Sequence, residues 1–133
     1  MKGRWLIVAA VAAQACTATT FPLGDRPVDV GLAFQETRAV PGTAMALTFE
    51  RVVGDSRCPV DVTCVWAGNA EVQIGATLAG GFHRSYRVSS FVEPHAFDVG
   101  SYHVTLLRVS PDRHENVPVD SLDYSVELRV EGH

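Results

Sequence analysis

The chain has 133 residues, of which 47% are hydrophobic and 20% charged, and a formal net charge of −4. This length is enough for one compact domain and too short for two. Eleven basic residues against fifteen acidic ones leave no basic patch that could neutralise phosphates, so the composition excludes a nucleic-acid-binding protein.

The first fifteen residues are typical of an export signal. Lys2 and Arg4 form a positive start, residues 5–13 are an apolar run, and Ala13-Gln14-Ala15 offers the small residues that a signal peptidase requires. A permanent transmembrane helix needs about 20 apolar residues, so this run is too short for one. We therefore expect residues 1–15 to be a signal peptide; a buried N-terminal helix of the domain is the alternative.

Cys16 follows the predicted cleavage site directly, and a polar tether over residues 17–20 comes after it. This arrangement resembles the lipobox of bacterial lipoproteins, which implies that Cys16 carries a lipid; plain secretion is the alternative. Residues 16–27 would then be anchor and linker. Without residues 1–15 the chain has nine arginines against fifteen acidic residues, a net charge of −6. We therefore expect membrane contact only through the lipid.

From residue 28 onwards, apolar and polar residues alternate with the period of two that predicts β-strands. The last segment is the clearest, because Tyr124, Val126, Leu128 and Val130 alternate with polar residues. The pair Leu106-Leu107 suggests a strand buried on both sides. Glycine, proline and asparagine mark turns, mostly 11 to 14 residues apart. The strand-like segments are 28–35, 45–53, 72–78, 82–90, 96–99, 102–109 and 124–130.

These strands predict one all-β domain over residues 28–133. We expect an antiparallel, immunoglobulin-like β-sandwich of seven to eight strands, with a small closed barrel as the alternative. No eleven-residue window after the signal has a helical period, so helices should be single turns at most. The polar stretch 112–122 should be an exposed loop before the last strand.

A connection of sixteen residues, 54–69, separates two of the predicted strands and is long for a compact β-domain. In an exported protein, Cys58 and Cys64 favour a disulfide over two free thiols. Pro59 restricts the chain inside the bridged segment. We expect Trp66 to cover the disulfide or to fill the open end of the sandwich.

Asp55 and Arg57 stand at the start of this connection, where they can pair with each other or cap backbone amides. The segments Asp55-Ser56-Arg57-Cys58-Pro59 and Cys64-Val65-Trp66-Ala67-Gly68-Asn69 resemble a D-S-R-C-P-x4-C-x-W-A-G signature of small bacterial exported proteins and lipoproteins of unknown function. The resemblance implies an envelope location and a β-rich domain, and it supplies no catalytic residues. We refer to residues 54–69 as the signature loop.

Three roles are open for the signature loop. It can be a structural connection, a preordered recognition surface, or a metal site made by Cys58 and Cys64 with Asp55, Asp61 or a histidine. The metal site is the least favoured, because zinc-type cysteine pairs usually stand two to four residues apart. We therefore expect no cofactor.

The remaining side chains form no catalytic motif. His83, His95, His103 and His114 have none of the spacings that place two metal ligands on one face. A nucleophile elbow and a glycine-rich phosphate loop are also absent from the sequence.

These patterns predict a non-catalytic bacterial cell-envelope lipoprotein that presents the signature loop to an envelope protein or ligand. The alternative is a ligand- or metal-binding domain. It would need three or more of six side chains to converge at one end of the sandwich, namely Asp55, Asp61, His83, His95, His103 and His114. A third hypothesis is an inhibitor of an envelope enzyme, which requires the signature loop to protrude.

Overall fold

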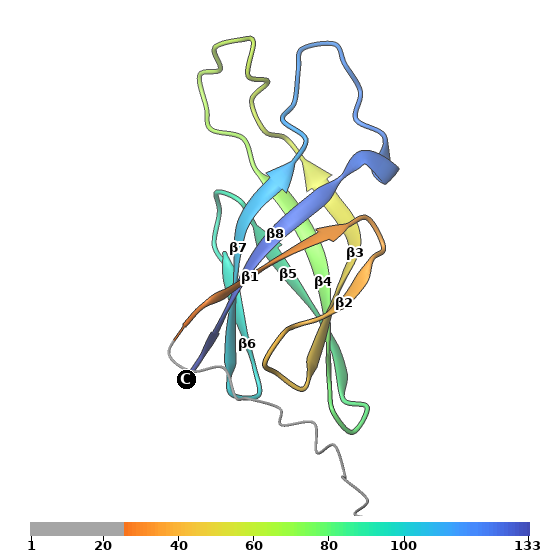
Figure 1. Ribbon diagram of the computed structural model, residues 1–133. Coiled ribbons are helices and arrows are strands. Elements are labelled where there is room, and N and C mark those ends of the chain that lie inside the picture. Colours follow the sequence, from red (N-terminus) through yellow and green to blue (C-terminus); the bar gives the residue numbers. More distant parts are fainter. Residues whose placement is uncertain (1–25) are drawn as a thin grey trace, which may run out of the picture.

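A computed structural model describes residues 26–133 of the chain (Figure 1). The predicted signal peptide 1–15, the lipidation site Cys16 and most of the linker 16–27 lie outside the described residues. Within residues 26–133, no helix has the length and apolar character needed to cross a membrane.

The regular secondary structure of the described residues is almost entirely β-strand, which confirms the predicted fold class. A single turn of 3-10 helix, η1 (Ser121–Asp123), precedes the last strand. The short β2 was not predicted, since all three of its residues are exposed and give no alternating pattern. The strands are β1 (Val28–Ala33), β2 (Thr37–Ala39), β3 (Met45–Asp55), β4 (Ala70–Leu78), β5 (His83–Ser89), β6 (Ala96–Val99), β7 (Tyr102–Ser110) and β8 (Ser125–Gly132).

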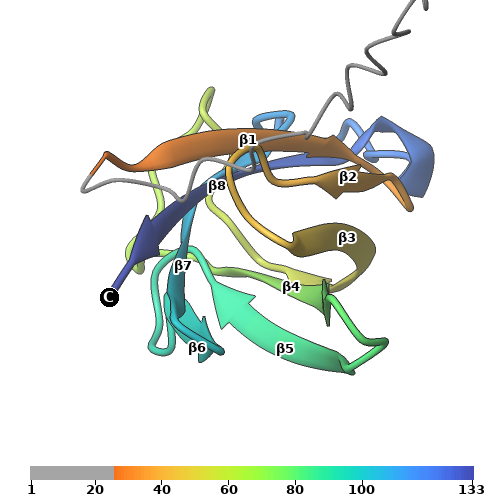
Figure 2. The same ribbon diagram turned by 60° about the horizontal axis from the view of Figure 1, so that its bottom comes forward.

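Two four-stranded sheets face each other, with strand orders β1-β8-β7-β6 and β2-β3-β4-β5. Every neighbouring pair of strands is antiparallel. Figure 2, in which the lower end of Figure 1 is turned forward, shows β1, β8, β7 and β6 following one another down one side of the domain and β2 to β5 down the other. The domain is therefore a β-sandwich, as predicted, and the barrel alternative is wrong.

The core consists of the inward-facing side chains of both sheets. Leu47, Phe49 and Ile74 from one sheet and Val104 and Leu128 from the other are fully buried. Each side chain of this kind stabilises the fold by about 1.5–3 kcal/mol relative to an exposed position. The alternating pattern in the sequence therefore identified the core-facing positions because burial has the same period as the pleat.

The prediction that β7 is buried on both sides at Leu106-Leu107 is wrong. Leu106 is only 8% exposed, but Leu107 is 41% exposed. The pairing of β7 with β8 shifts register between Leu106 and Arg108, as in a β-bulge. The extra residue lets both Leu106 and Val109 face the core and leaves Leu107 outside.

The two ends of the sandwich differ. At one end, the connections β3–β4, β5–β6 and β7–β8 emerge, and two of them extend well beyond the sheets (Figure 1). We call residues 54–69, 90–95 and 111–124 the loop end. At the other end lie the start of β1, the turn between β6 and β7, and the C-terminus (Figure 1). We call residues 26–28, 98–103 and 131–133 the hairpin end.

Candidate functional site

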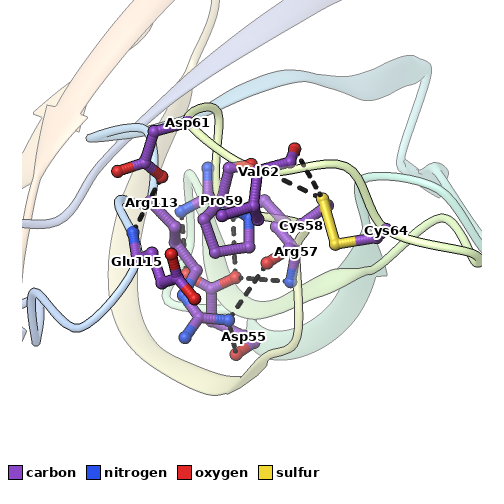
Figure 3. The surroundings of a disulfide bond; sticks show 9 residues. All are labelled: Asp55, Arg57, Cys58, Pro59, Asp61, Val62, Cys64, Arg113 and Glu115. Carbon is purple, nitrogen blue, oxygen red and sulfur yellow. Dashed lines mark hydrogen bonds and ion pairs between the residues drawn. A yellow bond between two sulfur atoms is a disulfide. The ribbon is translucent and has the colours of Figure 1, made fainter.

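The signature loop is closed by a disulfide between Cys58 and Cys64, whose Cα atoms are 5.9 Å apart (Figure 3). This confirms the predicted bridge. Because the two sulfurs are bonded to each other, they are not available as thiolate ligands, and a metal site that uses both cysteines is not formed. Strand β3 continues to Asp55, so the irregular part of the signature loop starts at Ser56.

Asp55, the last residue of β3, is held in a nearly buried ion pair with Arg57. Arg57 Nε donates to Asp55 Oδ1 and Arg57 Nη2 to Asp55 Oδ2, both at 2.8 Å. The Tyr124 hydroxyl donates to the same Oδ2 atom at 2.8 Å. A two-pronged arginine–carboxylate pair fixes orientation as well as distance, so the signature loop leaves β3 in one defined direction.

Arg57 also connects the signature loop to the opposite sheet. Its Nη1 donates to the carbonyl of Val109 at 2.7 Å, and its Nη2 donates to the carbonyl of Pro111 at 2.8 Å. A hydrogen bond also runs from the β7–β8 connection to the signature loop: Arg113 Nη1 donates to the carbonyl of Arg57 at 3.0 Å. The guanidinium groups thus join the β3–β4 and β7–β8 connections, which start in different sheets.

The surroundings of this ion pair shift the pKa values of its members. Burial acts to raise the pKa of the Asp55 carboxyl, but hydrogen bonds from Arg57 and Tyr124 outweigh it and hold that pKa below its ordinary value. The hydrogen bonds to Asp55 raise the pKa of Arg57. Burial, together with the hydrogen bond to Asp55, raises the pKa of Tyr124. Asp55 and Arg57 are therefore charged and Tyr124 neutral at pH 7.

A second set of contacts joins the outer parts of the two long loops. The amide of Val60 donates to the carbonyl of Arg113 at 2.8 Å. The amide of Glu115 donates to Asp61 Oδ1 at 2.8 Å, as Figure 3 shows. Each loop therefore supports the other along its length.

The base of the signature loop is closed by Ser56 and Asn69. The amide of Ser56 donates to the carbonyl of Asn69 at 2.7 Å, and the amide of Asn69 donates to Ser56 Oγ at 3.2 Å. Gly68 passes so close to this pair that a Cβ atom there would lie 1.8 Å from the carbonyl oxygen of Ser56. Asn69 Oδ1 also accepts from the amide of Phe91 at 3.0 Å, which ties the 90–95 connection to the same place.

Trp66 does not cover the disulfide or fill the end of the sandwich, so that prediction is wrong. Its side chain is 69% exposed, and that of the preceding Val65 is 91% exposed. The reason is that polar contacts and the disulfide already hold the loop, while the core is closed by residues of the strands. Trp66 is thus a large apolar side chain displayed on an ordered loop.

Most of the exposed apolar surface gathers at this end. Of the nine large hydrophobic residues that are exposed among the described residues, seven belong to the loop end. Phe82 and Leu107 lie elsewhere. The seven are Val60, Val65, Trp66, Phe91, Val92, Val117 and Leu122.

The same end is acidic. Residues 54–69 and 111–124 contain six aspartates and glutamates against two arginines. A shallow hollow of about 490 Å³ lies between the two long loops, lined by Pro59 and residues 113–118. The loop end therefore combines apolar side chains, negative charge and a concave surface.

The six side chains named for the ligand-binding alternative do not converge. His83 contacts Glu50 and Thr77, and His95 contacts Glu93 and the carbonyl of Ser89. Only Asp61 and His114 form a pair, with 3.8 Å between His114 Nδ1 and Asp61 Oδ2. These six side chains therefore do not form the common site that the alternative requires of them.

The structure instead brings His103 together with Asp98 and His133 at the hairpin end. Sequence reasoning missed Asp98 and His133. A signal for Asp98 existed, because Gly100-Ser101 marks a tight turn that places residues 98 and 103 opposite each other. The position of His133 depends on β8 lying beside β7, which no local pattern reveals.

Comparison of the chain with protein-family models, with curated proteins and with solved structures found no match.

Proposed function

We propose that the protein is a non-catalytic lipoprotein of the bacterial cell envelope that binds a protein partner through its loop end. One observation is central: Val65 and Trp66 are exposed on a loop that a disulfide, an ion pair and inter-loop hydrogen bonds hold in place. Exposed apolar patches of this kind are typical of interaction sites, and tryptophan is among the residues that contribute most to binding.

The order of the loop supports binding in a second way. Association costs free energy for every segment that must be fixed on contact, and preorganisation reduces this cost. Here Arg57, Arg113 and the disulfide fix the backbone of the signature loop before any partner arrives. A merely structural connection would have no need to display Trp66.

The chemistry of the surface indicates the kind of partner. An apolar pocket would accept Trp66, and a basic rim would complement the acidic side chains around it. Asp61 and Glu115, which are both exposed, are two of these acidic side chains. We therefore expect a partner with an apolar recess bordered by lysine or arginine, and binding that weakens as salt screens the rim charges.

The polar groups of the loop end support a non-catalytic role. The Asp55 carboxylate accepts hydrogen bonds from Arg57 and Tyr124, so it is not free to act as a general base. The second candidate is inhibition of an envelope enzyme, which the protruding loops favour. That candidate requires the captured partner to be an enzyme whose activity falls on binding.

The partner is tested by crosslinking in cells from a photoreactive amino acid at position 65. We expect one dominant crosslinked envelope protein. The purified pair should bind, and Trp66→Ala should weaken binding at least tenfold with the free energy of unfolding unchanged. Phe82→Ala is the matched control, since Phe82 is an exposed aromatic residue outside the loop end. Equal loss in both variants, or no loss with Trp66→Ala, would contradict the proposal.

The proposed anchor is tested separately by the intact mass of protein extracted from membranes. The lipobox resemblance supports a chain that begins at Cys16 and carries acyl groups, and Cys16→Ser should release the protein into the soluble fraction. Plain secretion predicts no acyl mass. The resemblance of the signature loop to small exported proteins supports the same envelope location.

A further inference from the structure

The hairpin end places three potential metal ligands side by side. The turn at Gly100, whose φ of 59° suits glycine, joins β6 to β7. This turn sets Asp98 directly opposite His103 in the pairing of the two strands. His133 follows β8, and its amide donates to the carbonyl of Ser101 at 3.0 Å. Three adjacent segments therefore supply one side chain each.

The ligand atoms are already close together. His103 Nδ1 lies 2.6 Å from Asp98 Oδ1, and His133 Nε2 lies 3.3 Å from the same oxygen. The three ligand atoms all lie within 4.8 Å of one another. The two imidazole rings are 6.0 Å apart, centroid to centroid, and inclined at 62°.

The cluster borders an open hollow of about 440 Å³, which His103, Glu131, His133 and Arg26 line. Glu131 is paired with His103 across β7 and β8, so both face the same side of the sheet. Asp98 and His133 are exposed and His103 is half-buried. An ion could therefore reach the ligands from solvent, with Glu131 adding negative charge nearby and Arg26 opposing it.

We propose that Asp98, His103 and His133 bind a divalent transition-metal ion of the zinc class. Two imidazole nitrogens and one carboxylate oxygen suit zinc, copper or nickel better than calcium or magnesium, which prefer oxygen ligands alone. Three protein ligands leave a fourth position for water, as in zinc sites that are not purely structural.

Little rearrangement would admit the ion. Zinc bonds of about 2.0–2.1 Å in a tetrahedron separate neighbouring ligand atoms by about 3.4 Å. The spacing of Asp98 and His133 already fits this value, and Asp98 and His103 need to part by less than about 1 Å. The Asp98 side chain is exposed, so it has room to turn by this amount. The site lies at the opposite end from the loop end and does not depend on the proposed function.

The test is a calorimetric titration of the full chain, produced without a histidine tag, with Zn²⁺. We expect one saturable site, at least tenfold weaker binding in His103→Gln and in Asp98→Asn, and no comparable site for Mg²⁺. Glutamine at position 103 can still hydrogen-bond to Asp98, so the hairpin should fold. The matched control is His114→Gln, which removes a histidine that also pairs with an aspartate but at the loop end.

Nitrogen chemical shifts of the histidine rings give an independent readout. On addition of Zn²⁺, the rings of His103 and His133 should shift together, while those of His83, His95 and His114 stay unchanged. The proposal is overturned if Zn²⁺ does not bind, or if His114→Gln weakens binding as much as His103→Gln does. It is also overturned if His103→Gln and Asp98→Asn, with thermal unfolding unchanged, bind Zn²⁺ as tightly as the parent chain.

Discussion

The Asp55 carboxylate accepts more hydrogen bonds than that of any other acidic residue at the loop end. Its carboxylate accepts hydrogen bonds from the backbone and side chain of Arg57 and from the hydroxyl of Tyr124. These donors come from the signature loop and from the residue before β8. A single side chain thus determines how two loops from different sheets are placed relative to each other.

Asp55→Asn should destabilise the domain by about 2 kcal/mol at pH 7, because it leaves the nearly buried Arg57 without its counter-charge. Since folding lowers the pKa of Asp55, its stabilising contribution is complete above the ordinary carboxyl pKa near 4 and is lost as the pH falls through the lower folded value. Urea unfolding at pH 7 and pH 3 measures both effects. The difference between parent and variant should shrink at pH 3; a constant difference would contradict this account.

Gly68→Ala should strain or open the base of the signature loop. A Cβ at this position would meet the carbonyl of Ser56, a backbone atom that cannot turn away, so the cost should be about 2 kcal/mol or more. Gly54→Ala is the control, because a Cβ there meets nothing within 4 Å. Hydrogen exchange should be faster at the amides of Ser56 and Asn69 in the first variant alone. Equal exchange in both would show that the close approach is not maintained in solution.

Among the elements, the signature loop owes its order to both covalent and ionic contacts. The disulfide closes seven residues, which in the chain-entropy model contributes about 2 kcal/mol. The ion pair of Asp55 and Arg57 lies outside the ring that the disulfide closes. The disulfide should therefore order the tip of the loop, and the ion pair its attachment to the sheets.

The double variant Cys58→Ser, Cys64→Ser should lose about 2 kcal/mol or less and keep the sandwich. We expect faster hydrogen exchange at residues 58–65. In β3 and β4, exchange should change only as much as the loss in the free energy of unfolding of the whole domain explains. The parent chain treated with reductant provides the matched comparison. Loss of protection throughout the sheets would show that the disulfide stabilises the whole domain and not the loop alone.

The clearest strand predictions came from segments whose burial alternates over at least two periods, such as β8 and the first part of β3. β2 was not predicted, because its three residues are all exposed and show no alternation. Burial of Leu107 was predicted wrongly because this residue is the extra one in a β-bulge. A bulge depends on the pairing with the partner strand, so the local sequence does not reveal it.

The site was predictable to a lesser degree. The disulfide and the pairing of Asp55 with Arg57 are short-range contacts, so the sequence indicated both. The contacts of Arg57 with Val109 and Pro111 join residues more than fifty positions apart and depend on the topology. Trp66 was expected inside because of its size, although neighbouring polar contacts leave it outside.

At the scale of the whole molecule, the open edges of the sheets have to avoid pairing with other chains. β5 is an edge strand of seven residues, and His83, Arg84 and Arg87 on it are exposed. Charged side chains on an edge strand oppose the approach of a second sheet. β2 and β6, which are also edges, have only three and four residues.

The double variant Arg84→Thr, Arg87→Thr should therefore self-associate more readily while its stability changes by less than about 1 kcal/mol, since both side chains are exposed. Light scattering against concentration measures the association. The matched control is Arg51→Thr, Arg108→Thr, which removes the same charge from the inner strands β3 and β7. Equal association in both double variants would assign the effect to net charge and not to the edge.

If the chain is anchored at Cys16 as proposed, the position of the N-terminal strand would orient the domain relative to the membrane. β1 starts at the hairpin end, where Arg26 and Pro27 lie beside His103 and His133. A chain anchored at Cys16 would have only residues 16–27 between lipid and domain, at most about 40 Å when fully extended. Such a chain would hold its hairpin end towards the bilayer and turn Trp66 outwards. A partner in the same membrane would then have to reach over the full length of the sandwich, whereas a partner in the space beyond would meet the loops first.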